Sequence, residues 1–239
     1  MTDLAMMFPE IPLADIEAKA QKLLDDYEAH VGLRIQAPIP VESIAEHYLG
    51  YQIDITDGGL FEDPRYLGGI VFDENVIRVN ASVESHEGRY NFTIAHEIGH
   101  HVLHRDQYLA ERDAEHPGIM CREFSARPLV EKQADQFASA LLMPAELIRR
   151  AAEQVIIPSG EMSVRALRVT AGKVIRAGRF TNVSNTAMAN RLIELGYAKG
   201  VDYQTGTGLD LLRVGQRSLF YGPYVAIRGA VRRVRKMIR

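Results

Sequence analysis

The chain has 239 residues, of which 46% are hydrophobic and 25% charged, a composition that is ordinary for a soluble globular protein with a full core. Its single cysteine excludes a fold held by internal disulfides, and no apolar run of roughly 18 residues is present to cross a membrane. The formal net charge of −3 excludes a strongly basic or acidic chain, and because no basic segment leads into an apolar stretch at the start, we expect a cytoplasmic location.

Two helices and a strand are expected in the N-terminal part. Apolar residues recur there at helical spacing and Gly32 is placed to end the helix; the positions are Ile16, Ala20, Leu23 and Tyr27. After the segment APIP, residues 41–49 predict a short second helix that Gly50 closes. The following YQIDIT alternates apolar and polar residues, as a half-buried strand does.

A β-hairpin is expected at residues 68–80, where the sequence is GGIVFDENVIRVN. Two runs rich in β-branched residues flank Asp73, Glu74 and Asn75, which is typical of a turn between antiparallel strands. The hairpin either packs on the helix that follows it or offers a strand at which a peptide can bind.

Residues 92–104 read FTIAHEIGHHVLH and contain the pattern HExxH. About 3.6 residues per turn place His96 and His100 on one face of a helix, about 6 Å apart along its axis, where both imidazoles can bind one metal ion. Glu97 borders the same site and can accept a proton from an attacking water molecule. Apolar residues at helical spacing anchor this helix in a core, so the pattern stands on a rigid element.

His104 is a tempting third ligand, but it lies two helical turns beyond His96. On a continuous helix this separation is roughly 12 Å, which is too far for both rings to reach one ion at about 2.1 Å. We therefore expect His104 to lie behind the ligands or on the surface.

Residues 105–129 contain Pro117, Gly118 and Pro128 with little periodicity, and we expect a loop that could border a cleft. Cys121 falls in this segment. It is either an ordinary loop thiol or a thiolate that caps the metal, because it lies between the HExxH segment and the next expected helix.

That next helix is expected at residues 130–144, VEKQADQFASALLMP, where an apolar stripe precedes the helix-ending Pro144. Glu131 and Asp135 are one turn apart beside the stripe, so both carboxylates point the same way. Glu131 is our candidate for the third metal ligand, and Asp135 can accept a hydrogen bond from a ligand histidine and fix its tautomer. The alternative is a pair of solvated carboxylates on an amphipathic helix.

A second region is expected after Pro158. Ser184 can cap a helix that Gly196 ends, and with residues 164–174 upstream this pair resembles a helix-turn-helix. Residues 161–191 hold six basic groups and one acid. The pair therefore either contacts DNA or packs on the rest of the chain.

The two ends of the chain differ in charge. Residues 1–30 hold seven acids and two lysines, whereas residues 225–239 hold six Arg or Lys and no acid. The basic segment either contacts a nucleic acid or an acidic partner, or is simply a solvated end. Before it, residues 198–222 favour a short β element.

The segments RYNFTIAHEIGHHVLHRD and VEKQADQFASALLMP, with the strand VIRVN before them, resemble the ImmA/IrrE family of bacterial and phage metallopeptidases. The resemblance covers about residues 35–145. It implies a thermolysin-like site in which His96, His100 and Glu131 bind zinc and Glu97 is the catalytic base. Mn2+ or Fe2+ can occupy a similar donor set.

The same resemblance implies an α+β fold. It predicts a zincin-like metallopeptidase domain with a small antiparallel sheet at residues 1–157, followed by a mainly helical, helix-turn-helix-like and basic region at residues 158–239. In a zincin-like fold, an edge strand before the HExxH helix lets a substrate peptide add as a further strand, and residues 70–80 are our candidate for it.

For the function, the resemblance implies zinc-dependent hydrolysis of a peptide bond, with a helix-turn-helix transcriptional repressor as the expected substrate and roles in transcription regulation and stress response. Tyr90, His101 and His104 are candidate donors to the oxyanion of the reaction. Two alternatives stay open: a DNA-binding regulator whose metal site is structural, and a partner that sequesters a repressor without cutting it.

Overall fold

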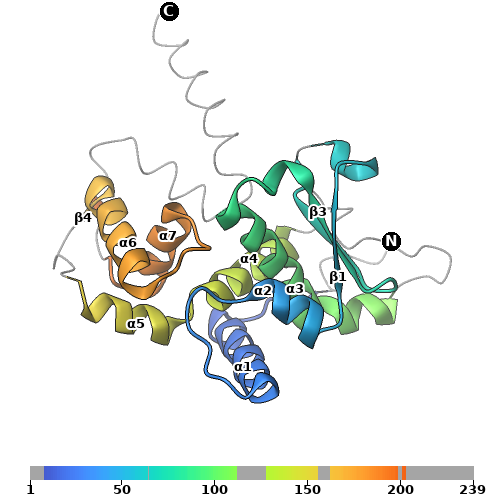
Figure 1. Ribbon diagram of the computed structural model, residues 1–239, viewed down its shortest axis with the longest axis horizontal. Helices are drawn as coiled ribbons and strands as arrows, with labels where there is room; N and C mark the ends of the chain where they lie inside the picture. The colour runs from blue at the N-terminus through green and yellow to red at the C-terminus, as the bar shows by residue number, and fades with distance from the viewer. Residues whose placement is uncertain (1–7, 64, 112–127, 156–161, 199–200, 203–239) are drawn as a thin grey trace, which may run out of the picture.

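The computed structural model of the chain describes residues 8–63, 65–111, 128–155, 162–198 and 201–202. These residues form seven α-helices and a three-stranded mixed sheet, which confirms the α+β class. In Figure 1 the sheet lies at one end of the molecule and helices α6 and α7 lie at the other, with α3 and α4 between them. None of the described helices is both long and apolar enough to span a membrane.

Some of the predictions concern residues outside these described ranges. Those made for Cys121 and for the basic segment 225–239 lie outside the described part of the chain. Of the β element expected at 198–222, the two-residue strand β5 (Val201–Asp202) is described, and it pairs in parallel with β4 (Met162–Ser163).

The N-terminal elements form where the sequence predicts them. Helix α1 spans Leu13–Val31 and ends at Gly32, whose φ of 70° is a left-handed conformation that favours glycine. Helix α2 (Val41–Ser43) continues as a π-helical turn, Ile44–Tyr48, and strand β1 spans Gln52–Thr56. The apolar face of α1 packs against α4.

The sheet has the order β1–β3–β2, with β2 at Gly68–Val71 and β3 at Val76–Asn80. The expected hairpin is confirmed, since β2 and β3 pair antiparallel around a turn in which Asn75 has a φ of 52°. Strand β1 pairs in parallel with β3, so the sheet is mixed rather than antiparallel. From β1 the chain passes a 3-10 turn at Gly59–Glu62 and enters the far edge of the sheet, and this crossover makes the pair parallel.

The substrate strand expected at residues 70–80 is wrong in its second half. Strand β3 is central, and both of its edges already pair with β1 and β2. Of the two hairpin strands, β2 is the one that lies at an edge. A peptide can therefore add beside β2 but not beside β3.

Helix α3 is longer than expected, and α4 begins and ends earlier than expected. Helix α3 spans Glu87–Glu111 and α4 begins at residue 128, so the loop predicted over 105–129 is wrong over 105–111 and 128–129. No Pro or Gly interrupts residues 105–111, and Pro117 comes too late in the sequence to end the helix there. Helix α4 spans Pro128–Leu142. A proline is tolerated at the first position of a helix, because the backbone N–H that proline lacks would have no acceptor within the helix.

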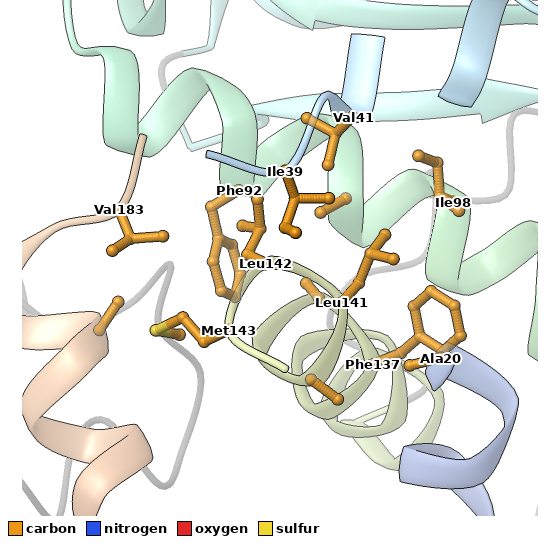
Figure 2. Packing of buried hydrophobic residues seen from close by; sticks show 14 of the residues in the cluster. Ala20, Ile39, Val41, Phe92, Ile98, Phe137, Leu141, Leu142, Met143 and Val183 are labelled. Carbon is orange, nitrogen blue, oxygen red and sulfur yellow. The ribbon is translucent and has the colours of Figure 1, made fainter. Parts of the chain in front are cut away.

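The hydrophobic core surrounds α4. Figure 2 shows Phe137, Leu141 and Leu142 of α4 between α3 on one side and Ala20 of α1 on another. All four side chains are at most 1% exposed, and burial of each of the three large ones contributes roughly 1.5–3 kcal/mol. This packing holds α3 and α4 against each other.

The C-terminal described helices are α5 (Ala145–Glu153), α6 (Val164–Gly178) and α7 (Asn185–Glu194). Ser184 caps α7 as the sequence predicts, because its hydroxyl accepts a hydrogen bond of 3.0 Å from the N–H of Ala187.

The α6–α7 pair packs on the rest of the chain. Asn182, in the turn between the two helices, donates to the carbonyl oxygen of Ile39 at 2.9 Å. Arg191 of α7 is 1% exposed, donates to the carbonyl oxygen of Met143 at 3.0 Å and pairs with Glu17 of α1. Much of the helix pair is therefore used for packing inside the protein.

Candidate metal centre

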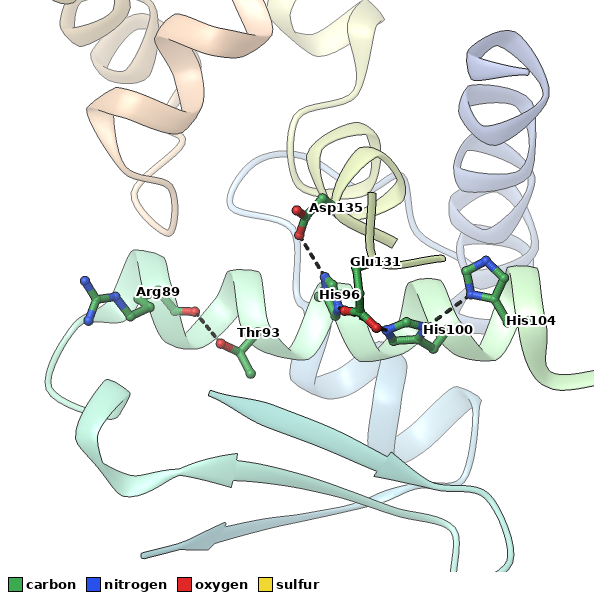
Figure 3. Close-up of polar contacts among 7 residues, drawn as sticks. All are labelled: Arg89, Thr93, His96, His100, His104, Glu131 and Asp135. Atoms are coloured by element: carbon green, nitrogen blue, oxygen red, sulfur yellow. Dashed lines mark hydrogen bonds and ion pairs between the residues drawn. The ribbon is translucent and has the colours of Figure 1, made fainter. Parts of the chain in front are cut away.

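Three histidines of α3 face two carboxylates of α4. His96, His100 and His104 recur one turn apart, so they share one face of α3. Glu131 and Asp135 share a face of α4 for the same reason. Figure 3 shows the two sets meeting on the side of α3 that is turned away from the sheet.

Two imidazole nitrogens and one carboxylate form a small triangle of potential ligand groups. The Nε2 atoms of His96 and His100 are 3.0 Å apart. Glu131 places its Oε2 atom 3.0 Å from Nε2 of His96 and its Oε1 atom 3.6 Å from Nε2 of His100. Ligands of a tetrahedral zinc ion with bonds of about 2.1 Å lie roughly 3.4 Å apart. The three residues, each at most 6% exposed, therefore fit one divalent cation.

Asp135 fixes the orientation of His96. Its Oδ1 atom is 2.9 Å from Nδ1 of His96, so the ring donates its Nδ1–H to the carboxylate and turns Nε2 to the triangle. Burial alone would lower the pKa of His96, but the hydrogen bonds and charges of Asp135 and Glu131 outweigh burial and raise this pKa well above its ordinary value.

Glu131 is held as a carboxylate. Burial alone would raise its pKa, but the interactions with the imidazoles of His100 and His96 together hold the pKa well below its usual range. An ionised carboxylate is the form that binds a metal ion.

His104 lies behind His100 and outside the triangle. Its Nδ1 atom is 3.1 Å from Nδ1 of His100, and its Nε2 atom is 2.9 Å from Oε1 of Gln133. Burial, and after it the neighbouring imidazole of His100, lower the pKa of His104 to about 3. Both ring nitrogens are engaged, so a contact with an oxyanion would require one of these hydrogen bonds to break.

The other two oxyanion candidates are hydrogen-bonded elsewhere. Tyr90 donates its hydroxyl to Oε1 of Glu42 at 2.7 Å, and burial together with this bond raises the pKa of Tyr90. His101 makes a bond of 2.8 Å between its Nδ1 atom and the hydroxyl of Tyr51. Neither side chain joins the triangle.

Glu97, the candidate base, lies against the edge strand β2. It is 2% exposed, and a Cβ atom placed on Gly68 would come within 3.0 Å of its Oε1 atom. The same Cβ would come within 2.4 Å of Cγ2 of Thr93, a clash. Glycine at 68 therefore lets the first residue of β2 approach both α3 and Glu97.

Sequence reasoning missed two residues of this environment, Gln133 and Gly68. A buried glutamine on an amphipathic helix has the same pattern as a solvated one, and a glycine that permits close approach looks like any glycine in a turn. The sequence carried no signal that singles out either residue.

The sequence model of the IrrE N-terminal-like domain, Peptidase_M78, matches residues 47–192, more than half of the chain. The matched part contains the sheet, both ligand helices and most of the α6–α7 pair. A search of the curated proteins finds no match.

Proposed function

Because the chain belongs to the IrrE N-terminal-like peptidase family, which is of the metallopeptidase type, we propose that it is a zinc-dependent endopeptidase. The observation that carries the proposal is the buried triangle of His96, His100 and Glu131 with Glu97 next to it in sequence. Two imidazoles and one carboxylate are a ligand set of hydrolytic zinc sites that keep a position open for the reaction. Mn2+ or Fe2+ could take the place of zinc in this set.

The chemistry divides between the cation and the protein. When bound, a divalent cation supplies Lewis acidity, which acidifies water and polarises a peptide carbonyl. Glu97 accepts the proton of the attacking water and returns it to the leaving amine. Asp135 and His104 hold the rings of His96 and His100 from behind, so the ligands stay in place during the reaction.

For substrate binding we propose that an extended peptide pairs with β2. This strand is at an edge of the sheet, and its outer side pairs with no other strand in the described part of the chain. Gly68 at the start of β2 lies against Glu97, so a peptide paired there would pass the candidate base.

As the substrate we propose a helix-turn-helix transcriptional repressor, whose cleavage would act in transcription regulation and stress response in the cytoplasm. The support is the resemblance of residues 89–106 and 130–144 to the ImmA/IrrE family. The test uses Glu97→Gln, which should keep the metal and the substrate without cutting, as bait in a host lysate. Retention of an intact repressor would support the proposal, and retention of DNA alone would contradict it.

A second function is favoured by the exposed face of α6. Arg165, Arg168, Lys173 and Arg176 are all exposed on one side of this helix, and Arg179 follows directly after it. None of the five side chains forms an ion pair with a described residue, and α6 contains no acid. We propose that this basic face contacts the phosphates of a nucleic acid.

Such a contact would be to the nucleic-acid backbone. In a helix-turn-helix the second helix reads base edges in the major groove. Here that helix is α7, in which only Asn185, Thr186 and Glu194 are exposed and most of the other residues are buried. The buried helix has few side chains to offer to bases, whereas α6 has charges to offer to phosphates.

A further inference from the structure

A chain of hydrogen bonds runs from the triangle to the N-terminal segment. His100 turns its Nε2 atom to the triangle, and its Nδ1 atom lies 3.1 Å from Nδ1 of His104, a contact drawn in Figure 3. Nε2 of His104 lies 2.9 Å from Oε1 of Gln133, and Nε2 of Gln133 donates to the carbonyl oxygen of Pro9 at 3.0 Å. His100, His104 and Gln133 are each at most 1% exposed, so they form hydrogen bonds with protein groups rather than with solvent.

The direction of every bond follows from the last one. A backbone carbonyl accepts hydrogen bonds and cannot donate them, so Gln133 turns its NH2 group to Pro9 and its oxygen to His104. Nε2 of His104 must then donate, and in a neutral imidazole the other nitrogen accepts. Nδ1 of His100 is therefore the donor, which leaves the lone pair of its Nε2 atom directed at the triangle.

We propose that His104 and Gln133 are positioning residues that hold His100 in its metal-binding tautomer, with the carbonyl of Pro9 as the fixed end of the chain. The inference rests on the metal centre proposed above. His96 is held differently, because the carboxylate of Asp135 contacts its ring directly. The orientation of His96 thus depends on α4 alone. The orientation of His100 depends on α4 and also on the segment that precedes α1.

Phe8, next to Pro9 in the segment that precedes α1, packs against His104. Its side chain is 4% exposed, and its ring meets the ring of His104 edge-on, with the centroids 5.7 Å apart and the planes at 86°. The segment therefore contacts the chain of bonds twice, through the Pro9 carbonyl at Gln133 and through the Phe8 ring at His104.

Two replacements of Gln133 separate this role from simple packing. Gln133→Glu keeps an oxygen that accepts from Nε2–H of His104, whereas Gln133→Met has a similar size and no such acceptor. We expect the Met variant to bind zinc about 10–100-fold more weakly than the wild type, and the Glu variant to stay within about threefold of it. If Gln133 only fills space, the order is reversed, because the buried carboxyl is then the worse replacement. The reversed order, or equal affinity in all three proteins, would overturn the proposal.

Tyr51→Phe is the matched control. It removes a hydrogen bond of 2.8 Å to His101, the residue after His100 on α3, and it lies outside the chain of bonds. Zinc affinity is measured by competition with a chromophoric chelator, and circular dichroism checks that each variant is folded. We expect unchanged affinity in Tyr51→Phe. A loss as large as that of Gln133→Met would assign the effect to a loosened α3 and overturn the proposal.

The wild-type protein provides a test that does not depend on any variant folding. Long-range 1H–15N NMR spectra report which ring nitrogen of a histidine carries the proton. We expect His104 to be protonated on Nε2 with and without zinc, and His100 to be protonated on Nδ1 when zinc is bound. His104 protonated on Nδ1 alone would overturn the proposal. If the wild-type protein binds no zinc, the proposed function fails, whereas the tautomer of His104 still decides whether the chain of bonds exists.

Discussion

Gly99 of α3 lies so close to Ala134 of α4 that a Cβ atom on Gly99 would come within 3.1 Å of the Ala134 carbonyl oxygen. It would also come within 3.2 Å of Cα of Ala134, another backbone atom of a packed helix that cannot move aside as a flexible side chain can. Glu131 stands about one turn before Ala134. The close crossing therefore sets how near Glu131 comes to the histidines of α3.

We predict that Gly99→Val weakens zinc binding, because α4 and with it Glu131 must move away from α3. The larger side chain should also lower the free energy of unfolding by about 1–3 kcal/mol through overpacking. Gly58→Ala is the control, since the Cβ atom added there meets Oγ1 of Thr56 at an ordinary 3.8 Å. Chelator competition and urea unfolding measure the two effects. Wild-type values of both in Gly99→Val would show that the crossing is not tight.

Replacing Glu131 and replacing Asp135 should reduce the zinc affinity to different extents. Glu131→Ala removes a ligand and should abolish stable zinc binding, whereas Asp135→Asn should weaken binding by about 10–100-fold because it perturbs the ring of His96. Zinc content after dialysis and chelator competition give the measurements. Unchanged zinc occupancy in Glu131→Ala would move the ligand role to Asp135, the other carboxylate on this face.

The pKa of His101 predicts a loss of stability in acid. Burial, and then the charge of Arg105, lower this pKa from 6.5 to about 4. The folded protein thus binds the proton less readily than the unfolded chain, so the stability that neutral His101 contributes is complete above pH 6.5 and falls as the pH drops towards 4. We expect the melting temperature of zinc-free His101→Gln to fall less over this range than that of the wild type. Parallel curves for the two proteins would contradict the assignment.

The basic face of α6 predicts salt-dependent binding to DNA of arbitrary sequence. The double variant Arg168→Glu/Arg176→Glu should bind more weakly, and the slope of log affinity against log salt should fall by about one for each phosphate that the variant no longer neutralises. Arg149→Glu is the control, because this arginine of α5 already pairs with Glu146. Wild-type binding that does not weaken with added salt would rule out a phosphate contact.

The helical period explains why the ligand pairs could be predicted. The spacing of His96 and His100, and that of Glu131 and Asp135, are properties of single helices and can be derived from about 3.6 residues per turn. The hairpin is local in the same way, since its turn residues separate two β-rich runs. The meeting of α3 with α4 is not local, and the sequence indicated it only indirectly, because a zinc site needs a third ligand and because the two segments resemble the same family.

The parts that the sequence did not reveal depend on distant contacts. Gln133 bonds to Pro9 across 124 positions of the chain, and the parallel pairing of β1 with β3 depends on a crossover between them. Neither contact leaves a periodic pattern. The end of α3 was misplaced for a different reason, because the first breaker after His104 is Pro117 and the residues before it are compatible with a helix.

Hydrolysis with Glu97 as the base is tested most directly on the repressor that the Glu97→Gln bait retains. That protein is incubated with the wild type and with Glu97→Gln, each carrying the same measured amount of zinc, and new N-termini are identified by mass spectrometry. We predict one set of cleavage products with the wild type and none with Glu97→Gln. Cleavage by Glu97→Gln at the wild-type rate would remove Glu97 from the mechanism, and an intact repressor with the zinc-loaded wild type would contradict the peptidase assignment.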